Sequence, residues 1–330
     1  MIRRYIALLP VVFIVACSNA APDLTVGLSD ISAPVDAGVL RVASPVSSLL
    51  FARTQPMAVA RTGDHKLRVL SLPDGKEIRA IDYGDRRVVA FDFSPNGTSV
   101  AIGDWTGLVT VWATATGQVQ FERRLSKYPG ILTFSPDGRM LATAAQGDAV
   151  QILDSATGAP LATLGSPIGG TLALAFSRDG RRVATGDGDT VVRIHDAATG
   201  KEVASNREFL MVPLAVVFSA DGASVFAASG DKFVTNIDAA NGKTVRKLER
   251  TTQPIQALDV SPDGKSILTI FMKSEDMTQP DHAVVRSVDT WQPRIDWLPP
   301  AMPVGGGWTS DGKVIVALGV KEGLHLWRLH

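Results

Sequence analysis

The residue types that most often catalyse reactions or bind metals are scarce in this sequence and scattered along it. Its 330 residues include one cysteine and five histidines, which lie at positions 65, 195, 282, 325 and 330. A single cysteine excludes a disulfide within the chain and a metal site built from several thiolates. The sequence also lacks a Cys-x-x-Cys-His segment for haem attachment and a Gly-x-Ser-x-Gly segment for a nucleophilic serine. We therefore expect no cofactor, no metal and no enzymatic activity.

Two groups of residues carry side chains that can bind metals, and for each we favour a structural role without a metal. Gly186-Asp187-Gly188-Asp189 has the glycine and acid content of a calcium loop, but no glutamate closes the ligand set. We interpret it as a tight turn with satisfied side chains. His65 and His282 fall in loops expected at one end of the fold, where a shared metal is the less favoured alternative.

The first seventeen residues have the pattern of a secretion signal. Arg3 and Arg4 are followed by an apolar stretch over residues 5–16, which is shorter than the about 20 residues that a membrane span needs. The stretch ends in Ile14-Val15-Ala16-Cys17, which resembles the lipobox of bacterial lipoproteins. The resemblance implies that residues 1–17 are a lipoprotein signal peptide and that Cys17 is lipidated.

Two alternatives to a lipoprotein signal stay open. One is cleavage nearby in a secreted protein whose cysteine is idle. The other is a twin-arginine signal, in which Ile6 would replace the usual phenylalanine. Ser18 after the cysteine resembles outer-membrane sorting, so we expect a lipid-anchored protein of the bacterial cell envelope, on the outer membrane and facing the periplasm. Residues 18–36, rich in Ser, Ala, Pro and Asp, are expected to be a flexible tether.

The charge balance limits the kinds of partner. Lysine and arginine total 33, as do aspartate and glutamate, so the formal net charge is zero. Nucleic acids and anionic membranes attract a basic surplus, which this chain does not have. We expect no nucleic-acid partner, membrane contact through the lipid anchor only, and a monomer that binds other proteins.

A five-residue motif repeats through the rest of the chain. Phe134-Ser135-Pro136-Asp137-Gly138 has close copies that begin at Phe93, Phe176, Phe218 and Val260, and a weaker one at Trp308. The steps between these first residues are 41, 42, 42, 42 and 48, which indicates a repeat architecture. Ser, Pro, Asp and Gly in this order favour a tight turn between two antiparallel strands. We predict that the motifs are hairpin turns, not binding sites.

A second landmark gives the number of repeats. Twenty residues after each motif begins, an apolar run closes, on Asp154, Asp196 and Asp238 in three of the units. The same spacing of twenty residues, sought before Phe93, identifies a degenerate first unit from Phe51 to Ser71. In the sixth unit the distance from Val260 to Asp289 is 29, which indicates nine inserted residues within 272–282. The count is seven units.

Each unit is expected to contain four strands, which in the third unit cover about 129–134, 139–144, 149–154 and 160–164. Four-stranded units of about 42 residues that close a third strand with a hydrophobe and Asp resemble the WD-repeat family, over residues 38–330 of this chain. The resemblance implies an all-β fold, a seven-bladed β-propeller of four-stranded antiparallel blades in a domain spanning 37–330. The family's Gly-His dipeptide is missing, so its buried Ser/His/Asp network is not implied. His195, where the family often has Trp, is expected to pack between blades.

The two ends of the chain are predicted to close the ring together. The last unit stops after its third strand, and Gly38-Val39-Leu40-Arg41-Val42 looks like a fourth strand. This N-terminal strand would join the last blade, and closure would remove the exposed sheet edges.

Loops before the first and third strands of each unit converge at one end of a propeller, the face that WD-repeat proteins commonly use for partners. The nine-residue insertion lies there too, and inserted loops often carry function. Arg, Met and aromatic residues are enriched at interfaces. The candidate partner-binding residues are Arg86, Arg87, Asp104, Trp105, Lys127, Tyr128, Arg207, Phe209, Met211, Gln253, Lys273, Glu275, Asp276 and Trp297.

The sequence thus favours a lipid-anchored, non-enzymatic scaffold that presents a loop face to partner proteins. One alternative is an enzyme or small-ligand binder that uses the central channel. It would need convergent polar groups on the innermost strands, which here are mostly apolar. The other alternative is a structural component of envelope or outer-membrane assembly, which rests on analogy of fold.

Overall fold

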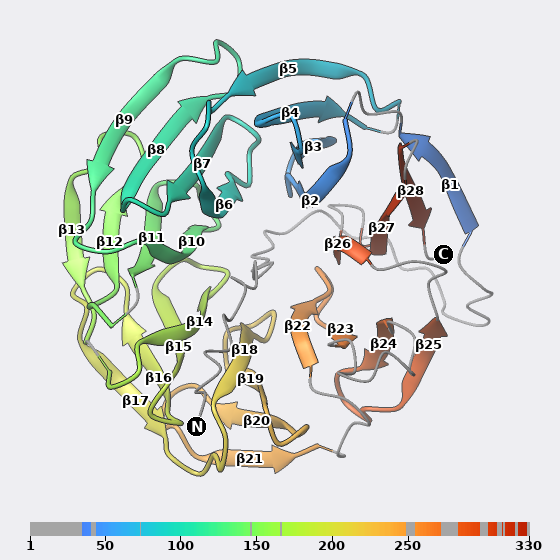
Figure 1. Ribbon diagram of the computed structural model, residues 1–330. Helices are drawn as coiled ribbons and strands as arrows, with labels where there is room; N and C mark the ends of the chain where they lie inside the picture. Colours follow the sequence, from blue (N-terminus) through green and yellow to red (C-terminus); the bar gives the residue numbers. More distant parts are fainter. Residues whose placement is uncertain are drawn as a thin grey trace, which may run out of the picture.

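The structure is a computed structural model that describes residues 35–40, 44–72, 74–145, 147–165, 167–248, 255–271, 283–297, 303–308, 312, 314–320 and 323–328. Within these ranges the regular elements are all β-strands, and they form a ring of four-stranded sheets around a central axis (Figure 1). No helix in the described part of the chain is long and apolar enough to cross a membrane.

Six blades are each built from four strands that follow one another in the chain. Blade 1 has β2 (Val46–Phe51), β3 (Met57–Thr62), β4 (Lys66–Ser71) and β5 (Glu77–Asp82), and blade 2 has β6 (Val88–Phe93), β7 (Ser99–Asp104), β8 (Leu108–Ala113) and β9 (Val119–Arg124). Blade 3 has β10 (Pro129–Phe134), β11 (Met140–Ala145), β12 (Gln151–Asp154) and β13 (Pro160–Thr163), and blade 4 has β14 (Thr171–Phe176), β15 (Arg182–Asp187), β16 (Val192–Asp196) and β17 (Glu202–Asn206). Blade 5 has β18 (Pro213–Phe218), β19 (Ser224–Ser229), β20 (Val234–Asp238) and β21 (Thr244–Lys247), and blade 6 has β22 (Ile255–Val260), β23 (Ser266–Phe271), β24 (Ala283–Ser287) and β25 (Pro293–Trp297).

The predicted fold class needs correction in how its blades are counted, whereas the predicted closure by the N-terminal strand is confirmed. Only six blades consist of four consecutive strands. The remaining sheet is a composite of β26 (Pro303–Trp308), β27 (Val314–Val320) and β28 (Gly323–Arg328) with β1 (Val35–Leu40) from the other end of the chain. β1 pairs antiparallel with β28, from Val35 opposite Arg328 to Leu40 opposite Leu324. The described joining strand covers 35–40, so it includes residues 38–40 of the predicted strand and begins before it, whereas residues 41 and 42 lie outside the described residues.

The repeated motif forms the hairpin turn between the first two strands of a blade, as predicted. In the third blade the Gly138 amide donates to the Ser135 carbonyl over 2.8 Å, and Gly138 has a φ of 72°. The Ser135 hydroxyl donates to Asp137 Oδ1 and accepts from the Met140 amide. These bonds satisfy the turn internally, so the motif carries the fold and offers no free ligand.

The count of inserted residues in blade 6 also needs correction. Asp154 pairs with Met140 in blade 3, and the residue in the corresponding place of blade 6 is Ser287, which pairs with Ser266. The turn that follows confirms this register, because the Trp291 amide donates to the Ser287 carbonyl as the Gly158 amide does to Asp154. Ser287 follows Val260 by 27 residues, so the insertion is seven residues instead of nine. Asp289 is not the strand-end residue, and Trp291 takes the place of the turn glycine with a φ of 64°.

Neighbouring blades pack through both faces of their inner strands. The buried clusters combine strands of successive blades, such as Val59 and Val69 of blade 1 with Phe91 and Phe93 of blade 2. Because each sheet is covered on both sides, its strands are apolar without clean alternation, and β7 is buried throughout.

A glycine-to-proline contact recurs between blades. A Cβ atom added to Gly103 at the end of β7 would lie 2.1 Å from Pro129 Cγ at the start of blade 3, and one added to Gly186 would lie 2.9 Å from Pro213 Cβ at the start of blade 5. The glycines in these Gly-Asp pairs therefore leave space for the next blade to approach.

We expect Gly103→Val to lower the free energy of unfolding by about 1–3 kcal/mol, because the new side chain overlaps Pro129 and pushes blades 2 and 3 apart. Urea unfolding followed by fluorescence measures the change. Gly165→Val is the matched control, since a Cβ atom there meets nothing within 4 Å. Equal stability of the two variants would contradict this account of the blade contact.

Candidate protein-binding face

Two kinds of loop meet at one end of the ring. The loop that enters a blade lies beside the loop before the third strand of the same blade. In blade 2 the Trp105 amide donates to the Arg87 carbonyl over 2.9 Å. The Gly188 amide donates to Gly170 in blade 4, and the Gly230 amide donates to Val212 in blade 5. We call this end the loop face and the opposite end, which carries the Ser-Pro-Asp-Gly turns, the turn face.

Three predicted residues come together on the loop face of blades 2 and 3. The Trp105 and Tyr128 rings are stacked, with centroids 4.4 Å apart and planes 8° from parallel. The guanidinium carbon of Arg87 lies 4.5 Å from the centroid of a Trp105 ring. Trp105 is nevertheless 46% exposed. These three residues, the aromatic cluster, hold an indole in a fixed orientation while leaving much of its surface open to a partner.

Close backbone contacts hold the loops of the aromatic cluster in place. The Leu125 amide donates to the Gly107 carbonyl over 2.8 Å, and Arg124 Nη1 donates to the Thr106 carbonyl over 2.9 Å. Gly107 has a φ of 87°, and a Cβ atom there would lie 2.8 Å from the Leu125 carbonyl oxygen. A glycine is therefore required for the loop that carries Trp105 to meet the loop that carries Tyr128.

Asp104 does not belong to the surface, which corrects its place among the predicted partner-binding residues. It is buried, and its Oδ1 accepts from the amides of Thr106 and Leu108 and from the Thr106 hydroxyl. It caps the turn that carries Trp105. Asp104 therefore positions the aromatic cluster from below instead of contacting a partner.

Two further cations of the predicted face are held by acids. Arg86 donates to the Thr110 hydroxyl over 2.7 Å and pairs with Glu122 over 3.4 Å. Lys127 is exposed and its Nζ lies 3.8 Å from Asp148 Oδ1. Both flank the aromatic cluster, but their charges are already partly compensated.

The loop into blade 5 forms an apolar patch on the same face. Arg207, Leu210 and Met211 are exposed, with Leu210 exposed by 84%, whereas Phe209 is only 7% exposed and packs in the core between blades 4 and 5. The prediction of a surface role for Phe209 is therefore wrong. Ile168, in the loop into blade 4, is 86% exposed. It was missed because a lone isoleucine in a loop carries no pattern.

Four of the remaining predicted residues lie outside the described part of the chain: Gln253, Lys273, Glu275 and Asp276. Trp297 is the last residue of β25 and pairs with Ala283, the first residue of β24, so it lies at the loop-face end of an outermost strand and not in the loop that follows.

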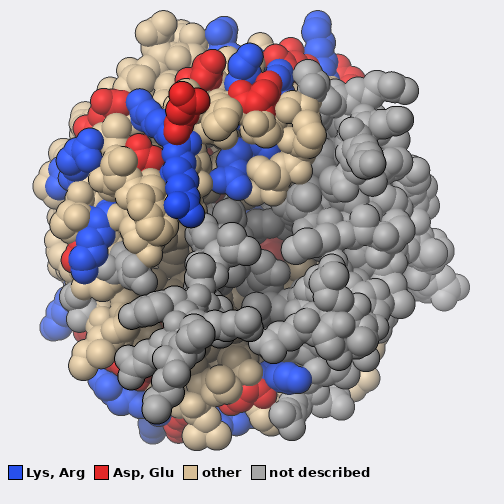
Figure 2. Space-filling model, viewed as in Figure 1, with Lys and Arg blue, Asp and Glu red and all other residues tan. Residues whose placement is uncertain are grey.

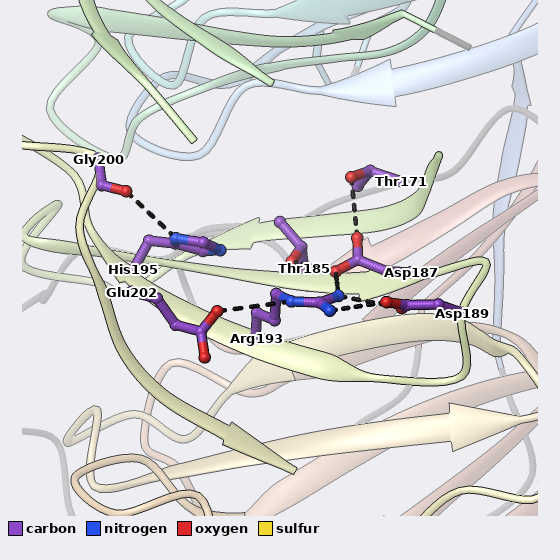
Figure 3. Close-up of polar contacts among 8 residues, drawn as sticks. All are labelled: Thr171, Thr185, Asp187, Asp189, Arg193, His195, Gly200 and Glu202. Carbon is purple, nitrogen blue, oxygen red and sulfur yellow. Dashed lines mark hydrogen bonds and ion pairs between the residues drawn. The ribbon is translucent and has the colours of Figure 1, made fainter. Parts of the chain in front are cut away.

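An arginine network stabilises the loop end of blade 4 (Figure 3). Arg193 Nη1 donates to Asp187 Oδ2 over 2.7 Å, Arg193 Nη2 donates to Asp189 Oδ2 over 2.6 Å, and its Nε lies 3.5 Å from Glu202. Thr171 and Thr185 donate to the two oxygens of Asp187. Burial raises the pKa of the Asp187 carboxyl, and the hydrogen bond from Arg193 counteracts the rise.

Two expectations about blade 4 are confirmed. Asp187 and Asp189 form a satisfied turn, as predicted for Gly186 to Asp189. His195 is buried, with Nδ1 3.3 Å from the Gly200 carbonyl oxygen, so it packs in the interior as expected (Figure 3). Within the described residues, no three His, Cys, Asp or Glu side chains are grouped so as to hold a metal.

A second group of charges lies at the turn-face end of the innermost strands. Asp92 Oδ2 accepts from the Phe134 amide of the next blade over 2.7 Å, and Asp259 Oδ2 accepts from the Trp308 amide over 3.2 Å. Arg53 Nη2 lies 3.8 Å from Asp259 Oδ2, and Arg178 donates to the carbonyls of Ser261 and Pro262. Burial raises the pKa of Asp92 to about 7 and that of Asp259 to about 6.

These four residues were missed, although the repeats carry a signal for them. Asp92 and Asp259 stand directly before the first residue of the motif, where blades 1, 4 and 5 have Leu50, Ala175 and Val217. Arg53 and Arg178 stand where other units have the turn proline. These charged residues therefore stand out from the equivalent positions of other units, although the strands as a whole are mostly apolar. Their oxygens and nitrogens tie blades to one another.

Comparison with known proteins agrees with this architecture. Residues 158–196 match the WD domain, G-beta repeat family. Over 121 residues the chain is 24% identical to U3 small nucleolar RNA-associated protein 21 of Saccharomyces cerevisiae, a stretch that covers 37% of this chain and 13% of that protein. A chain of a crystal structure of the mitotic checkpoint complex superposes with a TM-score of 0.77 at 18% identity, covering 96% of this chain and 98% of that one. The chain therefore has a propeller fold, in which residues 158–196 match a WD repeat.

We expect Arg193→Gln to lower the free energy of unfolding by about 3 kcal/mol, because Asp187 is left as a buried carboxylate without its cation. Thermal and urea unfolding measure the loss. Arg207→Gln, at an exposed arginine, is the control and should change stability by less than about 0.5 kcal/mol. A similar small effect at Arg193 would show that the network contributes little.

The raised pKa values of Asp92 and Asp259 predict a distinctive pH dependence. A carboxyl whose folded pKa lies above its unfolded pKa binds more protons in the folded state, so its contribution to stability falls as pH rises from about 4 to about 7. Asp92→Asn removes one such group. The stability of wild type relative to this variant should therefore fall by more than about 1 kcal/mol over that range. Urea unfolding at several pH values, with exposed Asp85→Asn as control, tests this, and parallel curves for wild type and Asp92→Asn would refute it.

Proposed function

We propose that this protein is a non-enzymatic, lipid-anchored scaffold of the bacterial cell envelope that binds partner proteins through its loop face. The observation that carries the proposal is the aromatic cluster of Arg87, Trp105 and Tyr128. Trp, Tyr and Arg are the residue types that most often dominate the binding energy of interfaces. Here they are held in fixed positions by backbone contacts, with Trp105 half-exposed.

The direction of β1 supports an anchor on the opposite side. β28 ends at the turn face, and β1 runs antiparallel to it, so β1 begins at the turn face with Val35 opposite Arg328. The chain that precedes β1 therefore joins the ring from that side. A lipid on Cys17 would hold the turn face toward the membrane and leave the loop face open to the periplasm, with the outer membrane as the proposed location.

The charges at the inner ends of the strands do not favour catalysis over scaffolding. Asp92 and Asp259 accept hydrogen bonds from the backbone of adjacent blades, and Arg178 donates to backbone carbonyls of blade 6. These contacts join Asp92, Asp259 and Arg178 to the backbone of other blades, although Asp259 Oδ1 and Arg53 Nη1 are buried without a hydrogen-bond partner among the described residues. The charged residues are therefore assigned to joining the blades, and the loop face is the proposed site.

Crosslinking in the intact envelope, followed by affinity capture of the full-length protein, tests this function. We expect a defined set of partner proteins, and we expect Trp105→Ala to reduce their capture by about tenfold, since truncating a central aromatic anchor typically costs more than about 1.4 kcal/mol. Leu161→Ala is the matched control, because Leu161 is 51% exposed on the outermost strand β13.

A third form that lacks residues 273–281 separates the loop face of blades 2 and 3 from the insertion. Partners lost only with this deletion would move the site to the insertion. Failure of the wild-type protein to capture any partner would refute the scaffold function.

A further inference from the structure

Three arginines around the aromatic cluster form no ion pair among the described residues. Arg61, Arg87 and Arg124 surround the loops of blades 1 to 3, and none of them forms an ion pair with a carboxylate among the described residues. Arg61 Nη1 donates to the Val88 carbonyl over 3.1 Å, and Arg124 Nη1 donates to the Thr106 carbonyl. Arg87 lies on the face of an indole. Their contacts are with neutral groups, so the three guanidinium groups are not held by a carboxylate of this chain.

The acids of the same loops are mostly occupied elsewhere. Glu122 is paired with Arg86, and Asp148 with Lys127 and the Ser126 hydroxyl. Asp104 caps its own turn, and Asp82 accepts from the Gly84 amide. Asp85 is exposed and is the remaining carboxylate in the loop that carries Arg87. Cations and acids are therefore present in similar numbers around the aromatic cluster, and what distinguishes Arg61, Arg87 and Arg124 is that none of them is tied to a carboxylate.

The placement of these charges is suited to recognition. Figure 2 shows Lys and Arg side chains interspersed with Asp and Glu on the side where β5 to β9 lie in Figure 1, with Lys and Arg side chains reaching the rim of the central hollow. Arg87 and Trp105 are exposed side by side, so a partner meets a cation and an apolar surface together. Guanidinium groups bind carboxylates in a bidentate manner, and the edge of an indole accepts an aliphatic side chain.

We infer that the partner segment that binds at the aromatic cluster is an extended acidic stretch of protein that contains apolar side chains. Its carboxylates pair with Arg87, Arg61 and Arg124, and an apolar side chain packs on Trp105. This inference rests on the proposed scaffold function and adds the chemistry of the partner. Three guanidinium groups without an ion pair suit a short run of carboxylates, whereas a neutral chain lacks the basic surplus that nucleic acids attract.

Fluorescence anisotropy tests this chemistry with a fluorescein-labelled peptide of sequence Glu-Glu-Leu-Glu-Glu-Leu-Glu-Glu. The purified full-length protein in detergent is titrated against this probe and against a version with glutamine at every glutamate position. We expect the glutamate probe to bind about tenfold more tightly or better, and to weaken as sodium chloride is raised.

Charge reversal locates the site on the protein. Arg87→Glu should weaken binding of the glutamate probe by about tenfold or more, and Trp105→Ala should weaken both probes. Arg181→Glu is the matched control, because Arg181 is exposed on the turn face of blade 4, and it should leave the affinity within about twofold. Unfolding curves of each variant confirm that it is folded.

Three results would overturn the inference: no binding of the glutamate probe, equal binding of both probes, or an equal loss of affinity in Arg87→Glu and Arg181→Glu. These results leave the scaffold function standing if the envelope capture still depends on Trp105. Failure of that capture, by contrast, removes the function on which the inference depends.

Discussion

The structure depends on the packing of each blade's inner strands against both neighbouring blades. A four-stranded sheet with two apolar faces is not stable in water by itself, and a ring supplies a cover for each face. The Gly103–Pro129 contact and the hydrogen bond from Phe134 to Asp92 show how closely adjacent blades approach. Because every blade needs two neighbours, the ring has to close, and β1 closes it by pairing with β28.

Closure also determines how the two faces are used. The strand that joins the ends of the chain begins at the turn face, so the preceding residues join the ring on that side. The turns there are short and satisfied by their own Ser and Asp side chains. The loop-face connections vary more in length, with three residues between β7 and β8 and seven between β13 and β14, and these loops carry the exposed Trp105, Leu210 and Met211. This division suits the proposed scaffold, which would be anchored on one side and bind partners on the other.

Charged side chains have two separate roles in this fold. Arg193 with Asp187, and Asp92 with the Phe134 amide, use buried charge to fix one blade or to join two. Arg87 and Arg124 are exposed and contact neutral groups, so their charge is available to a partner. Composition cannot separate these roles, because a buried charge and an exposed charge count the same toward the net charge of zero.

The sequence by itself determined the repeat, the positions of the turns and the joining of the chain ends, because glycines with positive φ and apolar runs act locally. It also indicated that Arg87, Trp105 and Tyr128 lie on one face. Only the tertiary structure decided that these three stack, that Phe209 turns inward, and that Asp104 is a buried cap. It also moved the strand end of blade 6 from Asp289 to Ser287. Such outcomes depend on which loops of neighbouring blades meet, and a repeat unit read alone does not contain that information.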